Sequence, residues 1–162
     1  MRRIPALALS GLAWLVGVPL AHGVLPWALS LVGPRLAGSW NVLGLGSVAL
    51  GAGLLGWVAV TGLAHTRELP ETLEVDWQPK VFIADGPYRL TRNPMYVGEL
   101  ALWLGWAVWF GSPIVALAGV ALFAAMTRAI RREESDLESR FGEAFRRYAA
   151  SVPRWLGRVS PS

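Results

Sequence analysis

The sequence predicts an all-α protein, a multi-pass transmembrane helix bundle of four spans or at most five. Three observations lead to this fold class. Charged residues make up 16% of the 162-residue chain, against roughly 25% in ordinary soluble domains, and the mean hydropathy is +0.43. Long segments carry no charge at all. The basic residues outside these segments fall almost entirely on one predicted side of the bundle.

The uncharged runs 4–32 and 41–64 are each long enough to cross a hydrocarbon core, which takes about 20 residues. Pro19 and Pro26 predict a kink or a break in the first run. The second run has small residues four positions apart, a spacing that favours close helix contact in lipid. These pairs are Ser47 and Gly51, Ala49 and Gly53, and Ala52 and Gly56.

A third apolar run, 100–126, has the turn signal Gly111-Ser112-Pro113 at its middle and is predicted to form two short crossing helices. Glu99 lies just inside this third span, either as an interfacial charge or as a functional group. Trp103, Trp106 and Trp109 follow it, and tryptophans there either pack against neighbours or wall an acyl channel.

Topology follows from the basic residues. With four spans, the N-terminus, the loop 66–95 and the C-terminal tail share one side, and only Arg35 lies on the other. The positive-inside rule predicts that the shared side is cytoplasmic. The pI near 10.3 then indicates attraction to anionic lipid headgroups rather than to nucleic acid. A secretory signal peptide over 1–23 is a poorer interpretation, since Leu20-Ala21-His22 is a poor cleavage site.

The chain has no cysteine, which excludes a disulfide framework, a thiol nucleophile and thiolate-held metal. Its two histidines, His22 and His65, are far apart, so no metal site is predicted. We find no repeat or linker, and predict one domain over 1–162, with N-terminal spans in 1–65 and a more polar half in 66–162.

The first polar block is GPYRLTRNPMY, from Gly86 to Tyr96. It follows a mildly acidic loop and a short extended patch, Val81-Phe82-Ile83. Asn is a favoured N-cap and Pro a favoured first helical residue, so Asn93-Pro94 predicts the start of the third span. The positive end of that helix is either a seat for an anion or an ordinary cap without a ligand.

The second polar block, RREESDLESRFGEAFRRYAASVPRW, is predicted to be helical, with Gly142 as a candidate break. Six of its residues and neighbours recur at steps of three and four and so share one face: Ile130, Glu134, Leu137, Phe141, Phe145 and Tyr148. Glu134 lies within this apolar stripe and Glu133 at its edge. A carboxylate there needs a partner, either Arg131 or Arg132 beside it or a ligand.

Together the two blocks resemble the signatures of the isoprenylcysteine carboxyl methyltransferase and phospholipid methyltransferase family, over about 80–155. The first block matches the family pattern G-x-Y-x-x-x-R-[H/N]-P-x-Y at Tyr88, Arg92, Asn93, Pro94 and Tyr96. The second matches at Phe141-Gly142, Tyr148 and Val152-Pro153-Arg154. Many members have His in place of Asn93, and since an amide takes no proton near neutral pH, Asn93 is left with capping and positioning.

The resemblance implies an integral membrane methyltransferase that uses S-adenosylmethionine (SAM), with 66–162 as its catalytic half. The implied cofactor pocket is cytoplasmic, between the loop before the third span and the C-terminal helix. The implied cofactor-binding residues are Lys80, Val81, Phe82, Ile83, Tyr88, Asn93, Pro94, Met95, Tyr96 and Glu133. The catalytic candidates are Arg128, Arg131, Arg132 and Glu134, and the arginines would orient an acceptor carboxylate.

Methyl transfer from a sulfonium requires no metal, because the donor is already activated and the protein has to orient the reactants. The acceptor stays open among an isoprenylcysteine-like carboxylate, a lipid amine and a small thiol. A non-catalytic membrane scaffold or transporter subunit is the alternative from another class. A nicotinamide-dependent membrane reductase has no phosphate-binding loop to support it.

Overall fold

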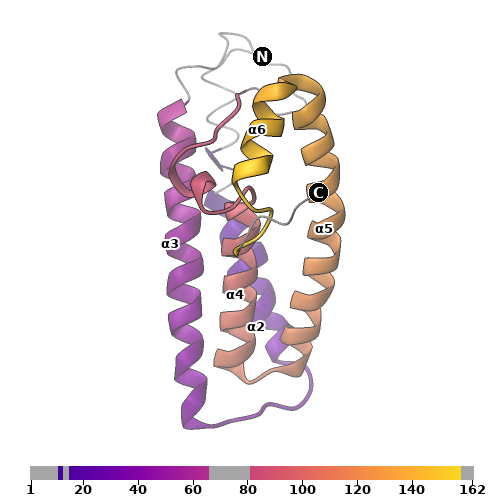
Figure 1. Ribbon diagram of the computed structural model, residues 1–162. Helices are drawn as coiled ribbons and strands as arrows, with labels where there is room; N and C mark the ends of the chain where they lie inside the picture. Colours follow the sequence, from indigo (N-terminus) through magenta and orange to yellow (C-terminus); the bar gives the residue numbers. More distant parts are fainter. Residues whose placement is uncertain (1–10, 13–14, 66–80, 158–162) are drawn as a thin grey trace.

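The computed structural model describes residues 11–12, 15–65 and 81–157, and these residues form helices and loops without a strand (Figure 1). The first helix, Leu15–Ser30, contains the π-turn η1 (Leu20–Val24) and α2 (Leu25–Ser30). The short 3₁₀ turn η2 (Ser39–Val42) leads into α3 (Leu43–Ala64). After the 3₁₀ turn η4 (Gly86–Arg89) come α4 (Pro94–Phe110), α5 (Pro113–Phe141) and α6 (Glu143–Ser151). The predicted all-α fold is confirmed for this part of the chain.

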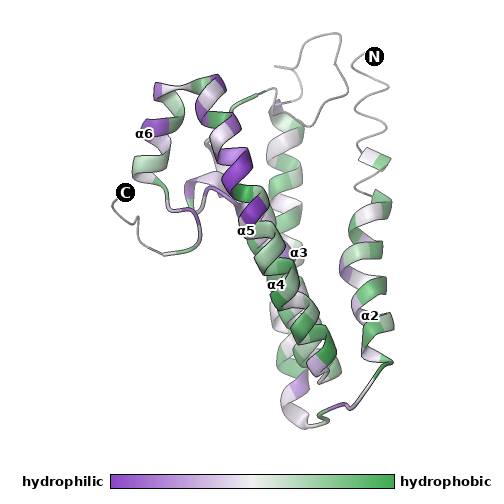
Figure 2. Ribbon diagram, turned by 90° about the vertical axis from the view of Figure 1, so that its right-hand side faces the viewer, coloured by the Kyte–Doolittle hydropathy of each residue, from purple (hydrophilic) through white to green (hydrophobic). Residues whose placement is uncertain are grey.

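The long helices run alongside one another, and α4 packs against α3, α5 and α2 (Figure 1). Hydropathy divides this bundle along its length, because α3 and α4 are largely apolar while the far end of α5 and α6 are polar (Figure 2). Among the described residues, Ser39–Ala64 and Pro113–Phe141 are long and apolar enough to cross a membrane. A total of four or five spans stays a prediction.

The predicted hairpin at Gly111-Ser112-Pro113 is confirmed, with α4 and α5 on its two sides. Gly111 ends α4 in the left-handed conformation, with φ +57°, which glycine adopts without steric cost. The Ser112 side chain caps α5 by accepting a hydrogen bond from the Val115 backbone N–H. Both helices extend beyond the apolar run, so their far ends carry the two polar blocks.

Glycines bring α3 and α4 into close contact. A Cβ on Gly51 would lie 2.7 Å from the Gly98 carbonyl oxygen, and one on Gly44 would clash with the backbone of Gly105. The Ser47 hydroxyl donates to the Ala101 carbonyl at 2.8 Å across the same interface. Of the predicted small-residue pairs, Ser47 and Gly51 therefore face α4. The other two pairs, Ala49 with Gly53 and Ala52 with Gly56, are exposed.

The first helix continues through its prolines by means of the π-turn rather than a break. Pro26 has no N–H to donate to the carbonyl of His22, four residues earlier. The indole N–H of Trp106 on α4 donates to that carbonyl instead, at 2.5 Å. The Leu25 N–H bonds to the Leu20 carbonyl, which is the wider π pattern. The carbonyl that the proline leaves free thus links the first helix to α4 through Trp106.

Candidate functional site

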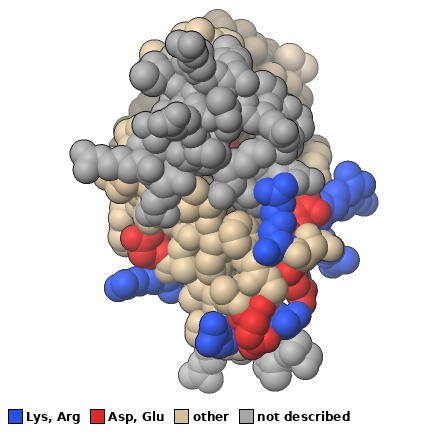
Figure 3. Space-filling model, turned by 90° about the horizontal axis from the view of Figure 1, so that it is seen from above, with Lys and Arg blue, Asp and Glu red and all other residues tan. Residues whose placement is uncertain are grey.

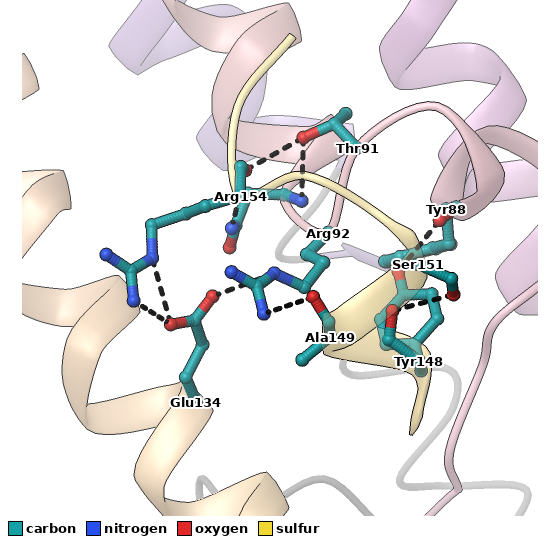
Figure 4. Close-up of polar contacts among 9 residues, drawn as sticks. Tyr88, Thr91, Arg92, Glu134, Tyr148, Ala149, Ser151 and Arg154 are labelled. Atoms are coloured by element: carbon teal, nitrogen blue, oxygen red, sulfur yellow. Dashed lines mark hydrogen bonds and ion pairs between the residues drawn. The ribbon is translucent and has the colours of Figure 1, made fainter. Parts of the chain in front are cut away.

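The two polar blocks meet at the polar end of the bundle. The Thr91 hydroxyl donates to the carbonyl of Arg154 at 2.9 Å (Figure 4). The Asn93 side-chain amide donates to the same carbonyl at 3.0 Å. The Arg92 backbone N–H donates to the Pro153 carbonyl at 2.8 Å. Segments far apart in the sequence are therefore joined side by side, as a shared site requires.

Glu134 connects α5 to this junction, the place where the segment before α4 meets the segment after α6. Its carboxylate lies 3.3 Å from Arg92 Nε and accepts two hydrogen bonds from Arg154, at 2.9 and 2.5 Å (Figure 4). These bonds raise the pKa of the Arg154 guanidinium. The Glu134 side chain is 12% exposed and that of Arg92 is 15% exposed. The partners of Glu134 are thus distant arginines, not the neighbouring Arg131 and Arg132, which are exposed.

Asn93 occupies the N-cap position of α4, and the helix begins at Pro94 as predicted. The predicted side-chain cap is wrong, since no hydrogen bond from the Asn93 side chain caps the helix. Its amide is turned toward the Arg154 carbonyl instead, and the residue is buried. Asn93 therefore positions the C-terminal segment against the start of α4.

Glu133 connects α5 to the first turn of α4. The Tyr96 hydroxyl donates to Glu133 Oε1 at 2.8 Å. Burial, and next the charge of Glu133, raise the pKa of Tyr88. The hydrogen bond brings together two of the predicted cofactor-binding residues, Tyr96 and Glu133, and the charge of Glu133 also acts on a third, Tyr88. Glu133 itself is exposed, so its carboxylate is accessible to a ligand.

The extended segment 81–83 lies against the corner between α5 and α6. The Phe82 ring is stacked on Phe141, with ring centres 5.3 Å apart, and meets Tyr148 edge-on at 5.4 Å. Gly142, with φ +51°, ends α5 as predicted and allows α6 to begin at once. Burial raises the pKa of Tyr148, whose hydroxyl donates to the Tyr88 carbonyl at 2.8 Å (Figure 4).

The remaining predicted residues are less closely connected. Arg128, Arg131 and Arg132 are exposed on α5, and Arg128 donates to the Ala124 carbonyl of its own helix at 3.3 Å. Pro94 is buried and Met95 half-buried in the first turn of α4. Lys80 lies outside the described residues. Seen from the polar end, acidic and basic side chains are interspersed (Figure 3).

One contact between ionisable residues was not predicted from the sequence. His22 Nε2 on the first helix lies 3.6 Å from Glu99 Oε1 on α4, and the indole N–H of Trp103 donates to His22 Nδ1 at 3.0 Å. Ionisable residues within apolar runs were the available signal. Nothing in the spacing of the two residues pairs one with the other.

Comparison with known proteins adds two matches. An uncharacterized protein from Haemophilus influenzae is 42% identical to this chain over 64 residues, which are 38% of this chain and the whole of that protein. No solved structure matches significantly. The sequence model of the phospholipid methyltransferase family matches residues 41–144. That range covers α3, α4 and α5 together with the contact between Tyr96 and Glu133. Because the match extends over more than half of the sequence, the chain belongs to the phospholipid methyltransferase family.

Proposed function

We propose that this protein transfers a methyl group from SAM to a lipophilic acceptor at the polar end of its helix bundle. Membership of a methyltransferase family supports the reaction class. The observation that carries the proposed site is the 2.8 Å hydrogen bond from Tyr96 to Glu133. It joins the two polar blocks where the start of α4 and the side of α5 meet.

The side chains at this place fit the groups of SAM. The exposed carboxylate of Glu133 would hold the ammonium group or the ribose hydroxyls. The start of α4, which has no side-chain cap, would favour the carboxylate through the positive end of the helix dipole. The segment 81–83, fixed by Phe82, would lie across the cofactor. SAM supplies an activated methyl group, so the protein has to hold donor and acceptor in line.

The acceptor side of the proposal is supported by an apolar groove between the first helix and α3. Its volume is about 350 Å³. It is lined by Gly11, Leu15, Val18, Pro19, Leu55, Gly56 and Ala59. An alkyl or prenyl chain fits such a lining, and membrane lipids have direct access to it if these helices lie in the bilayer.

The roles of the catalytic candidates differ. We assign Glu134 to positioning, because its carboxylate is already bound to Arg92 and Arg154. In the case of a carboxylate acceptor, Arg128, Arg131 and Arg132 would orient it, since their exposure on α5 leaves them accessible. We place the site on the cytoplasmic face, because the basic residues gather on that side of the predicted topology.

The test is calorimetric titration of the detergent-purified protein with S-adenosylhomocysteine. Glu133→Gln should weaken binding by about tenfold or more, since a hydrogen bond to a charged group contributes roughly 1.5–3 kcal/mol. Glu138→Gln is the matched control, because Glu138 lies on the same helix and pairs with Arg146 on an exposed surface at 3.5 Å. It should bind like the wild type.

Equal affinity of the Glu133→Gln variant and the wild type would remove Glu133 from the cofactor site. Absence of binding by a wild-type protein that circular dichroism shows to be helical would contradict the methyltransferase proposal. It would instead favour a non-catalytic scaffold or a transporter subunit.

A further inference from the structure

A second ionisable cluster lies beside the proposed cofactor site, one helical turn further along α4. Glu99 follows Tyr96 by three residues, which places both on one face of the helix about 4.5 Å apart along its axis. Its carboxylate lies 3.6 Å from His22 Nε2, and the two side chains are only 15% and 10% exposed. Ionisable groups enclosed in an apolar bundle are costly, so the pair calls for an explanation.

The hydrogen bonds around His22 fix its protonation. The indole N–H of Trp103 is only a donor, so His22 Nδ1, which accepts it at 3.0 Å, carries no proton. The ring is therefore neutral, with its proton on Nε2, the nitrogen nearest Glu99. Trp106 holds the backbone of the same residue through the carbonyl that Pro26 leaves unpaired. The imidazole is thus fixed both in place and in tautomer, and the nitrogen that carries its proton lies 3.6 Å from Glu99 Oε1.

Glu99 also lies on the same face of α4 as Tyr96, which contacts Glu133 at the proposed cofactor site. It lies within electrostatic range of Glu133 on α5 and of Tyr96 on its own helix. Among the described residues, the ionisable groups that interact with Glu99 are His22, Tyr96 and Glu133. The helix α3, which packs against α4, contains no charged residue. The negative charge of Glu133 acts on Glu99 and favours the binding of a proton or a cation there.

We infer that Glu99, positioned by His22 and Trp103, takes up the proton that the methyl acceptor releases. This inference rests on the proposed function. A lone pair on the nitrogen or sulfur of the acceptor forms a bond to the methyl carbon. The carbon–sulfur bond of SAM breaks, and its electron pair stays on the sulfur of S-adenosylhomocysteine. The proton of the acceptor heteroatom passes to a Glu99 carboxylate oxygen.

The inference favours acceptors with a dissociable proton over carboxylate acceptors. A carboxylate attacks without releasing a proton, and the negative charge of Glu99 would repel it. The first helix, which lies outside both signature blocks, then contributes to the reaction through His22. Glu99 is the catalytic residue in this arrangement, while His22 and Trp103 are positioning residues.

The tautomer of His22 is tested by nitrogen-15 NMR of protein labelled at histidine. The chain has two histidines, so a His65→Gln variant assigns the signals. We expect His22 to keep an unprotonated Nδ1 and a protonated Nε2 throughout about pH 5–8, the range in which an ordinary histidine titrates. Trp103→Phe should allow His22 Nδ1 to take up a proton within this range. Trp109→Phe, at an exposed position of the same helix, should leave Nδ1 unprotonated. A doubly protonated His22 within that range in the wild type would overturn the inference.

The role of Glu99 is tested by methyl transfer from labelled SAM to three probes: hexadecylamine, hexadecanethiol and the carboxylate N-acetyl-S-farnesylcysteine. We expect transfer to the amine or the thiol. Glu99→Gln should lower the rate of this methyl transfer by about a hundredfold or more, the usual contribution of general-base catalysis. Affinity for S-adenosylhomocysteine should stay unchanged. Glu99→Asp should restore part of the rate and alter its pH profile, which a purely structural residue would not do.

Transfer to the carboxylate alone, transfer to none of the probes, or an undiminished rate in Glu99→Gln would each overturn the inference. Failure of the proposed function is distinguishable from these results, because it appears as absent S-adenosylhomocysteine binding in the wild type. The NMR experiment examines His22 in either case.

Discussion

Glu134 shows how one carboxylate can organise the polar end of this protein. It lies in the apolar stripe of α5, yet it contacts Arg92 before α4 and Arg154 after α6. Removing one partner of such an enclosed pair costs far more than the pair contributes to stability, because a charge is left without compensation. Asn93 acts similarly, since its amide is used for the Arg154 carbonyl rather than for a helix cap.

Glu134→Gln should therefore destabilise the protein by about 3 kcal/mol, the lower end of the range for breaking a buried ion pair, because Arg154 is 40% exposed. Thermal unfolding in detergent, followed by circular dichroism, measures the change. Glu143→Gln is the control, since Glu143 and its partner Arg146 are 66% and 55% exposed, and such surface pairs contribute little. Equal melting temperatures for the two variants would show that Glu134 does not hold the junction.

At the scale of elements, the contact between α3 and α4 positions the start of the candidate site. Gly51 and Gly98 allow the two backbones to approach, and the Ser47 hydroxyl bridges them. In lipid, helix association depends on packing of this kind rather than on a hydrophobic driving force. The residues that line this contact on α4 lie directly after Tyr96, so its geometry also sets the position of Tyr96 and Glu99.

Gly51→Ala should separate these helices and destabilise the protein by about 1–3 kcal/mol, as overpacking usually does, because its Cβ would meet the Gly98 carbonyl and the backbone of Leu102. Gly53→Ala, two residues further along, meets nothing within 4 Å. It should be neutral or slightly stabilising, since alanine favours helix. Thermal unfolding of both variants compares them, and a larger loss in Gly53→Ala would mean that the interface is wrongly placed.

At the scale of the whole molecule, the protein has two unlike ends. The end formed by the loop before α4, the far part of α5 and α6 is polar and carries both signature blocks, while the connection before α3 and the α4–α5 turn lie at the other end (Figures 1 and 2). A lipophilic acceptor and a water-soluble cofactor meet most directly at such a boundary between apolar and polar surfaces.

Cysteine labelling tests this orientation, because the natural chain contains no cysteine. Ser139→Cys places a thiol at the exposed polar end of α5, and Ser39→Cys places one at the opposite end. With a membrane-impermeant thiol reagent added outside intact cells, only Ser39→Cys should react if the polar end is cytoplasmic. Lysed cells, in which both should react, provide the control. Labelling of Ser139→Cys alone in intact cells would show that the polar end faces outward, opposite to the predicted topology.

Much of the fold was predictable from the sequence because it depends on short-range preferences. The apolar runs, the Gly111-Ser112-Pro113 turn, the start of α4 at Pro94 and the end of α5 at Gly142 each follow from a few neighbouring residues. Hydropathy and the local φ and ψ preferences of glycine and proline suffice for these features. The resemblance of the two polar blocks indicated the family, which the match over 41–144 confirms.

The choice of long-range partners was decided only by the tertiary structure. The neighbouring Arg131 and Arg132 were the arginine partners that the sequence suggested for Glu134. In the structure its carboxylate pairs with Arg92 and Arg154 instead. The pairing of His22 with Glu99 depends on the same kind of information. The rotation of each helix about its axis determines which residues meet across the bundle, and that rotation is set by packing of all the helices together. Local sequence determines where helices begin and end, whereas the close packing of this bundle determines which of their polar residues can act together.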